Sequence, residues 1–151
     1  MGWAMMIRVF AGLALALTIA ASGAQGAPQQ AVLKRLDGTR IDWELDRRTP
    51  GARQGVLVIA QGSGCSSAIT NRNIEAAKGL LLPDFAVVTV EKYGVAPGAV
   101  QKGPADCSAL FFAHHTVSQR VSDYRAVIGQ LKTAPWWNGQ LVLFGGSEGR
   151  R

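Results

Sequence analysis

Three short runs of mostly apolar residues constrain the fold of this chain more than any other feature. They occupy residues 55–60 (GVLVIA), 85–91 (FAVVTVE) and 140–144 (QLVLF). Continuous apolar runs of this length are typical of strands covered on both faces, as in a parallel sheet. Helical segments lie between them, and strands that alternate with helices indicate parallel strands joined by crossover helices. The sequence therefore predicts an α/β fold with the order β-α-β-α-β.

Two segments carry the helical signals. Residues 71–78 are followed by Gly79, which is expected to end the first helix. The second helix is expected over residues 116–132, where Thr116 and Gln119 have the spacing of a capping box. A stripe with helical spacing predicts the face of this helix that packs on the sheet. The stripe consists of Val117, Val121, Tyr124, Ile128 and Leu131.

A β-hairpin is expected ahead of these elements, over residues 32–45. Asp37-Gly38 is a strong signal for a two-residue turn. After the turn, apolar and polar residues alternate, which predicts one buried face and one solvent-exposed face. Ile41, Trp43 and Leu45 form the apolar set, and Arg40, Asp42 and Glu44 form the polar set.

The first 26 residues have the features of a signal peptide. Arg8 supplies one positive charge, residues 9–21 are almost wholly apolar, and small residues follow. The apolar run is shorter than the ~20 residues that span a bilayer. We therefore expect cleavage of residues 1–26, a domain over 27–151, no stable membrane anchor, and a periplasmic or secreted location.

The two cysteines, Cys65 and Cys107, are expected to form a disulfide, because an even number of cysteines in an exported chain favours a bridge. A zinc site that also uses His114 and His115 is the alternative. The spacing of these residues matches no compact zinc-ligand pattern. The sequence therefore predicts no cofactor and no metal site.

The chain has a formal net charge of +6. Nucleic-acid binding would require clustered charge with aromatic residues interleaved for stacking. The basic residues around the hairpin lack such aromatic neighbours, which predicts a solvated basic surface and no nucleic-acid partner. These residues are Lys34, Arg35, Arg40, Arg47, Arg48 and Arg53.

A G-x-S-x-G motif follows the third apolar run directly. It comprises Gly145, Gly146, Ser147, Glu148 and Gly149. The pattern is typical of a sharp strand-to-helix turn that holds a serine in strained backbone geometry, with Gly145 and Gly149 avoiding clashes. The serine hydroxyl then stands exposed at the N-terminus of a helix, where developing negative charge is favoured. A glycine-rich turn without chemistry is the structural alternative.

A second glycine-rich loop follows the first apolar run, at residues 61–64 (QGSG). Acyl transfer needs two backbone N–H donors directed at the oxyanion. The residue after the nucleophile, Glu148, would supply one donor, and Ser63 is our candidate for the other. Gly62 and Gly64 would let the backbone turn its amides inward. A tight turn without this role is the alternative.

Residues 55–149 resemble the N-terminal core of an α/β-hydrolase of the exported serine esterase or peptidase-like kind. The resemblance is carried by VLVIAQGSGC, VVTVEKYGV, RVSDYRAVIGQL and LVLFGGSEG. It implies that Ser147 is the nucleophile and that the backbone amides of Glu148 and Ser63 form the oxyanion hole. A small-molecule or peptide acyl compound would be the substrate. Gln61 stands where many members carry His, a position outside the catalytic triad.

In this family the acid and the histidine of the triad follow the nucleophile along the chain. Only residues 148–151 follow Ser147, so a truncated domain without activity is expected. His114 and His115 precede the nucleophile strand, and we expect them to have a helix-entry or loop-packing role instead. Asp106 and Asp123 are likewise expected to be surface or loop residues.

Two other classes of protein remain as alternatives. A dinucleotide-binding unit would use Gly62, Gly64 and Ser67 after the first strand, with Glu91 at the end of the next strand as the ribose-binding acid. Ser67 in place of the final glycine, the preceding hairpin and the expected export all disfavour it. A non-catalytic exported scaffold, or pseudoenzyme, is the other class, because the expected triad is incomplete.

Overall fold

The computed structural model describes residues 26–80 and 84–146. Five strands and three α-helices follow one another along this part of the chain. They are β1 (Gln29–Lys34), β2 (Arg40–Asp46), β3 (Gln54–Ala60), α1 (Arg72–Leu80), β4 (Ala86–Val90), α2 (Ala109–His114), α3 (Val117–Leu131) and β5 (Trp137–Gly145), with a 3₁₀ turn at Pro104–Asp106 before α2. The predicted order of hairpin, strand, helix, strand, helix and strand is confirmed; α2 is an addition.

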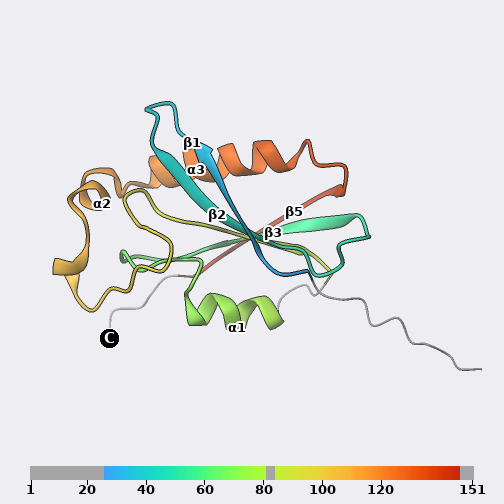
Figure 1. Cartoon of the computed structure of the whole chain (residues 1–151), viewed down its shortest axis with the longest axis horizontal. Coiled ribbons are helices and arrows are strands. Elements are labelled where there is room, and N and C mark those ends of the chain that lie inside the picture. The colour runs from blue at the N-terminus through green and yellow to red at the C-terminus, as the bar shows by residue number, and fades with distance from the viewer. Residues whose placement is uncertain (1–25, 81–83, 147–151) are drawn as a thin grey trace, which may run out of the picture.

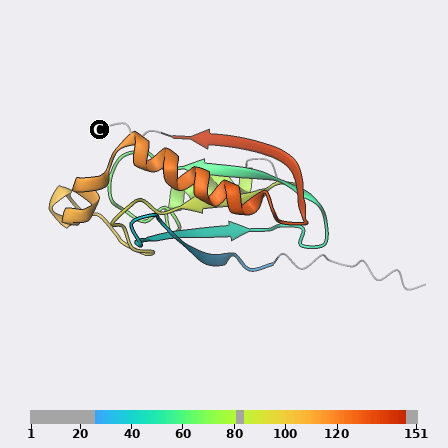
Figure 2. The same ribbon diagram turned by 90° about the horizontal axis from the view of Figure 1, so that it is seen from above.

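The strands form one mixed sheet in the order β1-β2-β4-β3-β5. Strands β4, β3 and β5 are parallel to one another, whereas β1 and β2 form an antiparallel hairpin joined to β4. Helix α3 covers one face of the sheet and α1 covers the opposite face (Figure 1). Viewed from above, α3 crosses the strands between the hairpin and β5 (Figure 2). This is the predicted α/β class with a parallel sheet.

Strand β3 is buried on both faces because a helix lies on each side of it. Val56 and Val58 pack in the core beneath α3, together with Val127 of that helix. Leu57 and Ile59 point the other way and pack in the core beneath α1. The alternation of side chains along the strand thus supplies both cores from one apolar run.

The hairpin turn differs from the predicted two-residue turn. The Arg35 N–H donates to the Thr39 carbonyl (2.8 Å) and the Gly38 N–H donates to the Arg35 carbonyl (3.0 Å). These bonds enclose a three-residue loop, in which Gly38 adopts φ +83°. Three-residue hairpin loops place glycine in this left-handed conformation. The Asp-Gly signal therefore located the turn correctly and gave its length incorrectly.

The face of α3 that packs on the sheet is rotated relative to the predicted stripe. Asp123, Val127 and Leu131 are its buried residues, whereas Val117 is 81% exposed and Val121 is 42% exposed. Asp123 is only 1% exposed, which corrects its prediction as a surface or loop residue. Its buried carboxylate forms an ion pair with Arg35.

The start of α3 confirms half of the predicted capping box. The Thr116 hydroxyl accepts a hydrogen bond from the Gln119 N–H (3.1 Å). The Gln119 side chain does not return to the cap; its Nε2 donates to Asp123 Oδ1 (2.9 Å). The Thr116 N–H, which a capping box would pair with the Gln119 side chain, donates to the His114 carbonyl instead (2.8 Å).

The polar face of β2 is also more buried than predicted. Glu44 is buried, since α1 covers this face of the strand, and it accepts a hydrogen bond from Lys78 Nζ (2.8 Å). Arg35 is likewise not part of a solvated basic surface, because its side chain is 7% exposed. Within the described ranges, no helix is long and apolar enough to cross a bilayer.

Candidate active site at the ends of β3 and β5

The carboxyl ends of β3 and β5 lie side by side. Ala60 pairs with Gly145 in the parallel register, and the Gly146 N–H donates to the Ala60 carbonyl at 3.3 Å. The glycine-rich loop after β3 and Gly146, the second residue of the G-x-S-x-G motif, therefore lie at the same edge of the sheet. In open α/β sheets this edge is where ligands bind.

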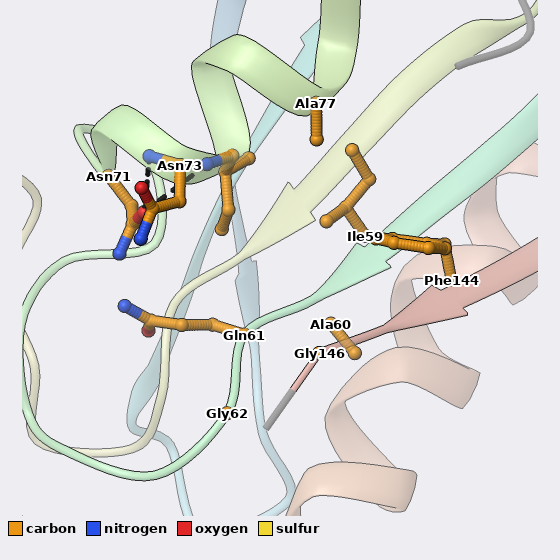
Figure 3. Close-up of a pocket in the computed structure, with 10 residues that line it drawn as sticks. Ile59, Ala60, Gln61, Gly62, Asn71, Asn73, Ala77, Phe144 and Gly146 are labelled. Carbon is orange, nitrogen blue, oxygen red and sulfur yellow. Dashed lines mark hydrogen bonds between the residues drawn. The ribbon is translucent and has the colours of Figure 1, made fainter. Parts of the chain in front are cut away.

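A pocket of about 390 Å³ opens at this edge, between the two strand ends and α1. One side is apolar, with Ile59, Ile74, Ala77 and Phe144. The other side carries three carboxamide side chains, and Figure 3 shows them gathered at the N-terminal end of α1. They belong to Gln61, Asn71 and Asn73. Ala60, Gly62 and Gly146 complete the lining with little more than backbone.

Glu91, which directly follows β4, holds the loop between β3 and α1 in place through hydrogen bonds. This carboxylate is buried and accepts hydrogen bonds from the Ser67 hydroxyl, from the Ala68 N–H (2.8 Å) and from the Ile69 N–H (3.1 Å). All of its partners belong to this one loop. Glu91 is thus a structural anchor, and a buried carboxylate so engaged is not available to bind a ribose, as the dinucleotide alternative requires.

The segment after β4 holds the same loop from the side. Cys65 and Cys107 form the predicted disulfide. The Cys65 N–H donates to Gln101 Oε1 (2.9 Å), the Ser67 N–H donates to the Ala99 carbonyl (2.7 Å), and Lys92 Nζ donates to the Gly64 carbonyl. The loop after β3 is therefore fixed by covalent and hydrogen-bonded contacts on both sides.

Three consecutive backbone N–H groups of this loop have no hydrogen-bond acceptor in the described part of the chain. In contrast to Cys65, Ser67, Ala68 and Ile69, the N–H groups of Gly62, Ser63 and Gly64 donate to no acceptor in the described part of the chain. Gly64 adopts φ +96°, a backbone conformation that favours glycine. Fixed donors without an internal partner are what an oxyanion site requires.

Several predicted site residues lie outside the described residues. These are Ser147, Glu148 and Gly149 of the motif, together with the signal peptide up to residue 25. Gly145 ends β5, and Gly146, the chain neighbour of Ser147, lines the pocket.

The two histidines have the loop-packing role expected of them. His114, the last residue of α2, stacks on Tyr93 with ring centroids 3.9 Å apart. His115 stacks on Phe111 at 4.4 Å. Burial lowers the pKa of His115, and the positive charges of Lys92 and Arg120 lower it further. Neither histidine lines the pocket.

Asp106 lies in the 3₁₀ turn and is exposed, as predicted; its carboxylate accepts from the N–H groups of Lys102 and Gly103. Across residues 26–80 and 84–146, no group of three or more His, Cys, Asp or Glu residues could hold a metal ion.

Sequence reasoning missed most of the contacts that shape this site. The sequence indicated Glu91 only as a possible ribose ligand, and it indicated no role for Gln101 or Lys92. Helix α2 (Ala109–His114) was also missed, although Ser108 provides its cap by accepting from the Phe111 N–H at 3.0 Å. The serine before an apolar segment was the available signal.

Glu91 gives a testable pH dependence. Burial raises the pKa of Glu91 above its ordinary value of 4.5, although the hydrogen bonds from Ser67, Ala68 and Ile69 oppose the increase. The folded state then holds the proton more firmly than the unfolded chain, so the free energy of unfolding falls as the pH rises above 4.5. We expect E91Q to remove this part of the pH dependence in urea denaturation series between pH 4 and 7.

The control for that series is E75Q, which neutralises an exposed carboxylate on α1. An E91Q protein with the same pH profile as the wild type and E75Q would contradict the assignment.

No protein-family model matches this chain, and no curated protein matches its sequence. Among solved structures, it is similar to a cold-adapted esterase from an Arctic intertidal metagenomic library. The TM-score is 0.59 at 14% identity, covering 80% of this chain and 50% of that one. It is also similar to brefeldin A esterase, a bacterial homologue of human hormone sensitive lipase. Here the TM-score is 0.52 at 19% identity, covering 89% of this chain and 34% of that one.

These likenesses show the fold and nothing finer, because the identities are low. The mixed sheet with helices on both faces is part of an α/β-hydrolase fold, as the sequence predicted. The chain spans half or less of the length of these two structures.

Proposed function

We propose that this chain carries the nucleophile and the oxyanion loop of a serine hydrolase that cleaves acyl esters or amides. The observation that carries the proposal is the set of unengaged amides at Gly62, Ser63 and Gly64, held rigidly beside the end of β5. The sequence places Ser147 one residue beyond Gly146, which lines the same pocket. A nucleophile and fixed donors would thus meet at one cavity.

In the proposed reaction, Ser147 Oγ attacks the carbonyl carbon of the substrate, and a base takes the hydroxyl proton. The negative charge that develops on the carbonyl oxygen is stabilised by the Ser63 N–H and by the N–H of Glu148. The leaving alcohol or amine departs with a proton, and water then hydrolyses the acyl-enzyme. The described lining of the pocket contains no titratable side chain, so we assign the base to none of these residues.

A fluorophosphonate probe tests the proposal, since it reacts with serines that are activated as nucleophiles. Labelling of the wild-type chain at Ser147, located by peptide mass spectrometry and absent from S147A, would support an activated nucleophile in this chain. S108A is the matched control, because Ser108 caps α2 away from the pocket. Labelling that persists in S147A would overturn the assignment of the nucleophile.

The second candidate is a non-catalytic scaffold, which the absence of a titratable group in the described pocket lining favours. Complete lack of labelling in a folded wild-type chain would select it. Export is part of the proposal for both candidates, because a disulfide is typical of oxidising compartments. The intact mass of protein isolated from the producing cells tests for cleavage near residue 26.

A further inference from the structure

The side-chain amide of Gln61 is buried without a partner. Both its Oε1 and its Nε2 are inaccessible to solvent, and neither forms a hydrogen bond within the described part of the chain. Buried polar groups in folded proteins are nearly always satisfied, because an unmade hydrogen bond costs more than a made one gains. An unsatisfied donor and acceptor on one side chain at a pocket are therefore a candidate binding site for a polar group from outside the chain.

The surroundings of Gln61 narrow the chemistry of that ligand. Figure 3 shows its side chain extending from the loop after β3 towards Asn71, at the start of α1. Asn71 Oδ1 already accepts from the N–H groups of Asn73 (2.9 Å) and Ile74 (3.2 Å), which caps the helix. The amide group of Asn71 is left as a further donor. A ligand here would meet donors and one acceptor close together.

Charge and apolar lining narrow the ligand further. No residue of the described part of the lining is charged, so an ion bound here would gain no counter-charge from these residues in return for its lost hydration. Ile59 and Phe144 form an apolar wall opposite the carboxamides. A volume of about 390 Å³ suits a small organic group rather than a long chain.

We infer that this pocket binds an uncharged carboxamide on a short apolar chain. The Gln61 side chain turns from its covered position towards the pocket, where its Nε2 donates to the carbonyl oxygen of the ligand and its Oε1 accepts from the ligand N–H. The apolar chain lies along the side of the pocket formed by Ile59 and Phe144. As a statement about the substrate, this inference rests on the proposed function, and the carboxamide would then belong to the acyl side of the substrate. As a statement about binding, it stands on Gln61 alone.

Three probes of similar size separate the contributions of a hydrogen-bond donor, a hydrogen-bond acceptor and a charge to binding. Hexanamide offers both a donor and an acceptor, 2-heptanone offers an acceptor alone, and hexanoate carries a charge. We expect the S147A protein, titrated with each probe by NMR, to bind hexanamide about 5-fold more tightly than either of the others, as one added neutral hydrogen bond implies. Q61M in the S147A background should abolish this preference.

Q130M is the matched control, because Gln130 is exposed on α3; it should keep the preference for hexanamide. The melting temperature supplies a second readout that is independent of any ligand. Q61M removes an unsatisfied buried amide and should melt at the same temperature as the parent or higher. A lower melting temperature would mean that Gln61 has a partner within the fold.

Equal binding of hexanoate, or a preference that survives Q61M, would overturn the inference. Failure of the proposed function has a different signature. If Ser147 is never labelled but S147A binds hexanamide through Gln61, the pocket inference stands and the hydrolase proposal fails. If Ser147 is labelled and hexanamide shows no preference, the hydrolase proposal stands and the pocket inference fails.

Discussion

Replacing Asp123 with alanine is expected to lower the free energy of unfolding by about 3–5 kcal/mol. Arg35 donates two hydrogen bonds to this carboxylate, from Nε to Oδ1 at 2.8 Å and from Nη2 to Oδ2 at 2.9 Å. The two side chains are only 7% and 1% exposed. The alanine variant would leave the guanidinium buried without its counter-charge, and urea denaturation at neutral pH measures the loss.

The exposed pair between Arg40 and Asp42 is the matched control for this prediction. Arg40 is 66% exposed, so D42A should cost about 0–1 kcal/mol. The double variant R35M/D123L should recover much of the loss, because removing both charges leaves no unpaired ion. A D123A protein no less stable than D42A would show that the buried pair does not hold the hairpin to α3.

Removal of the disulfide has the second large expected effect. The bridge between Cys65 and Cys107 closes a loop with a sequence separation of 42. In the chain-entropy model, a loop of this length stabilises the folded state by about 4 kcal/mol. The variant C65S/C107S should therefore unfold at a much lower urea concentration than the oxidised wild type.

Reduction with dithiothreitol gives an independent measurement of the same effect. The wild type should lose stability on reduction, whereas the stability of C65S/C107S should not change. The same midpoint for oxidised and reduced wild type would contradict the prediction. Because the bridge also joins the loop after β3 to the segment before α2, the hydrogen-bonded amides of Ser67, Ala68 and Ile69 should exchange with solvent faster once it is removed.

The elements that could be predicted from the sequence are those with a local physical cause. The apolar run at residues 55–60 is a strand that buries side chains on both faces, because a helix covers each side of the sheet. Thr116 caps α3 through a bond to a residue three positions away. The Asp37-Gly38 signal located the turn, but loop length depends on the register of both strands, which a dipeptide does not encode.

The rest depends on contacts between residues far apart along the chain. Asp123 has the sequence signature of a surface residue, and it is buried because Arg35, 88 positions earlier, reaches it. Val117 and Val121, which belong to the predicted stripe, are exposed instead.

At the candidate site, the glycine-rich loop after β3 and the disulfide were predictable from motifs and counting. The carboxamide wall of the pocket was not, because α1 brings Asn71 and Asn73 to Gln61 only in the folded chain.

The position of β5 in the sheet affects the entropy cost of bringing its strand partner to it during folding. In the described sheet β5 pairs with β3 alone, and Trp137 lies opposite Gln54, 83 residues earlier. In the hairpin, by contrast, Lys34 and Arg40 pair across six residues. Loop-closure entropy makes the longer closure costlier by about 2 kcal/mol. The two strands whose ends meet at the pocket are therefore the pair that random motion of the chain brings together least often.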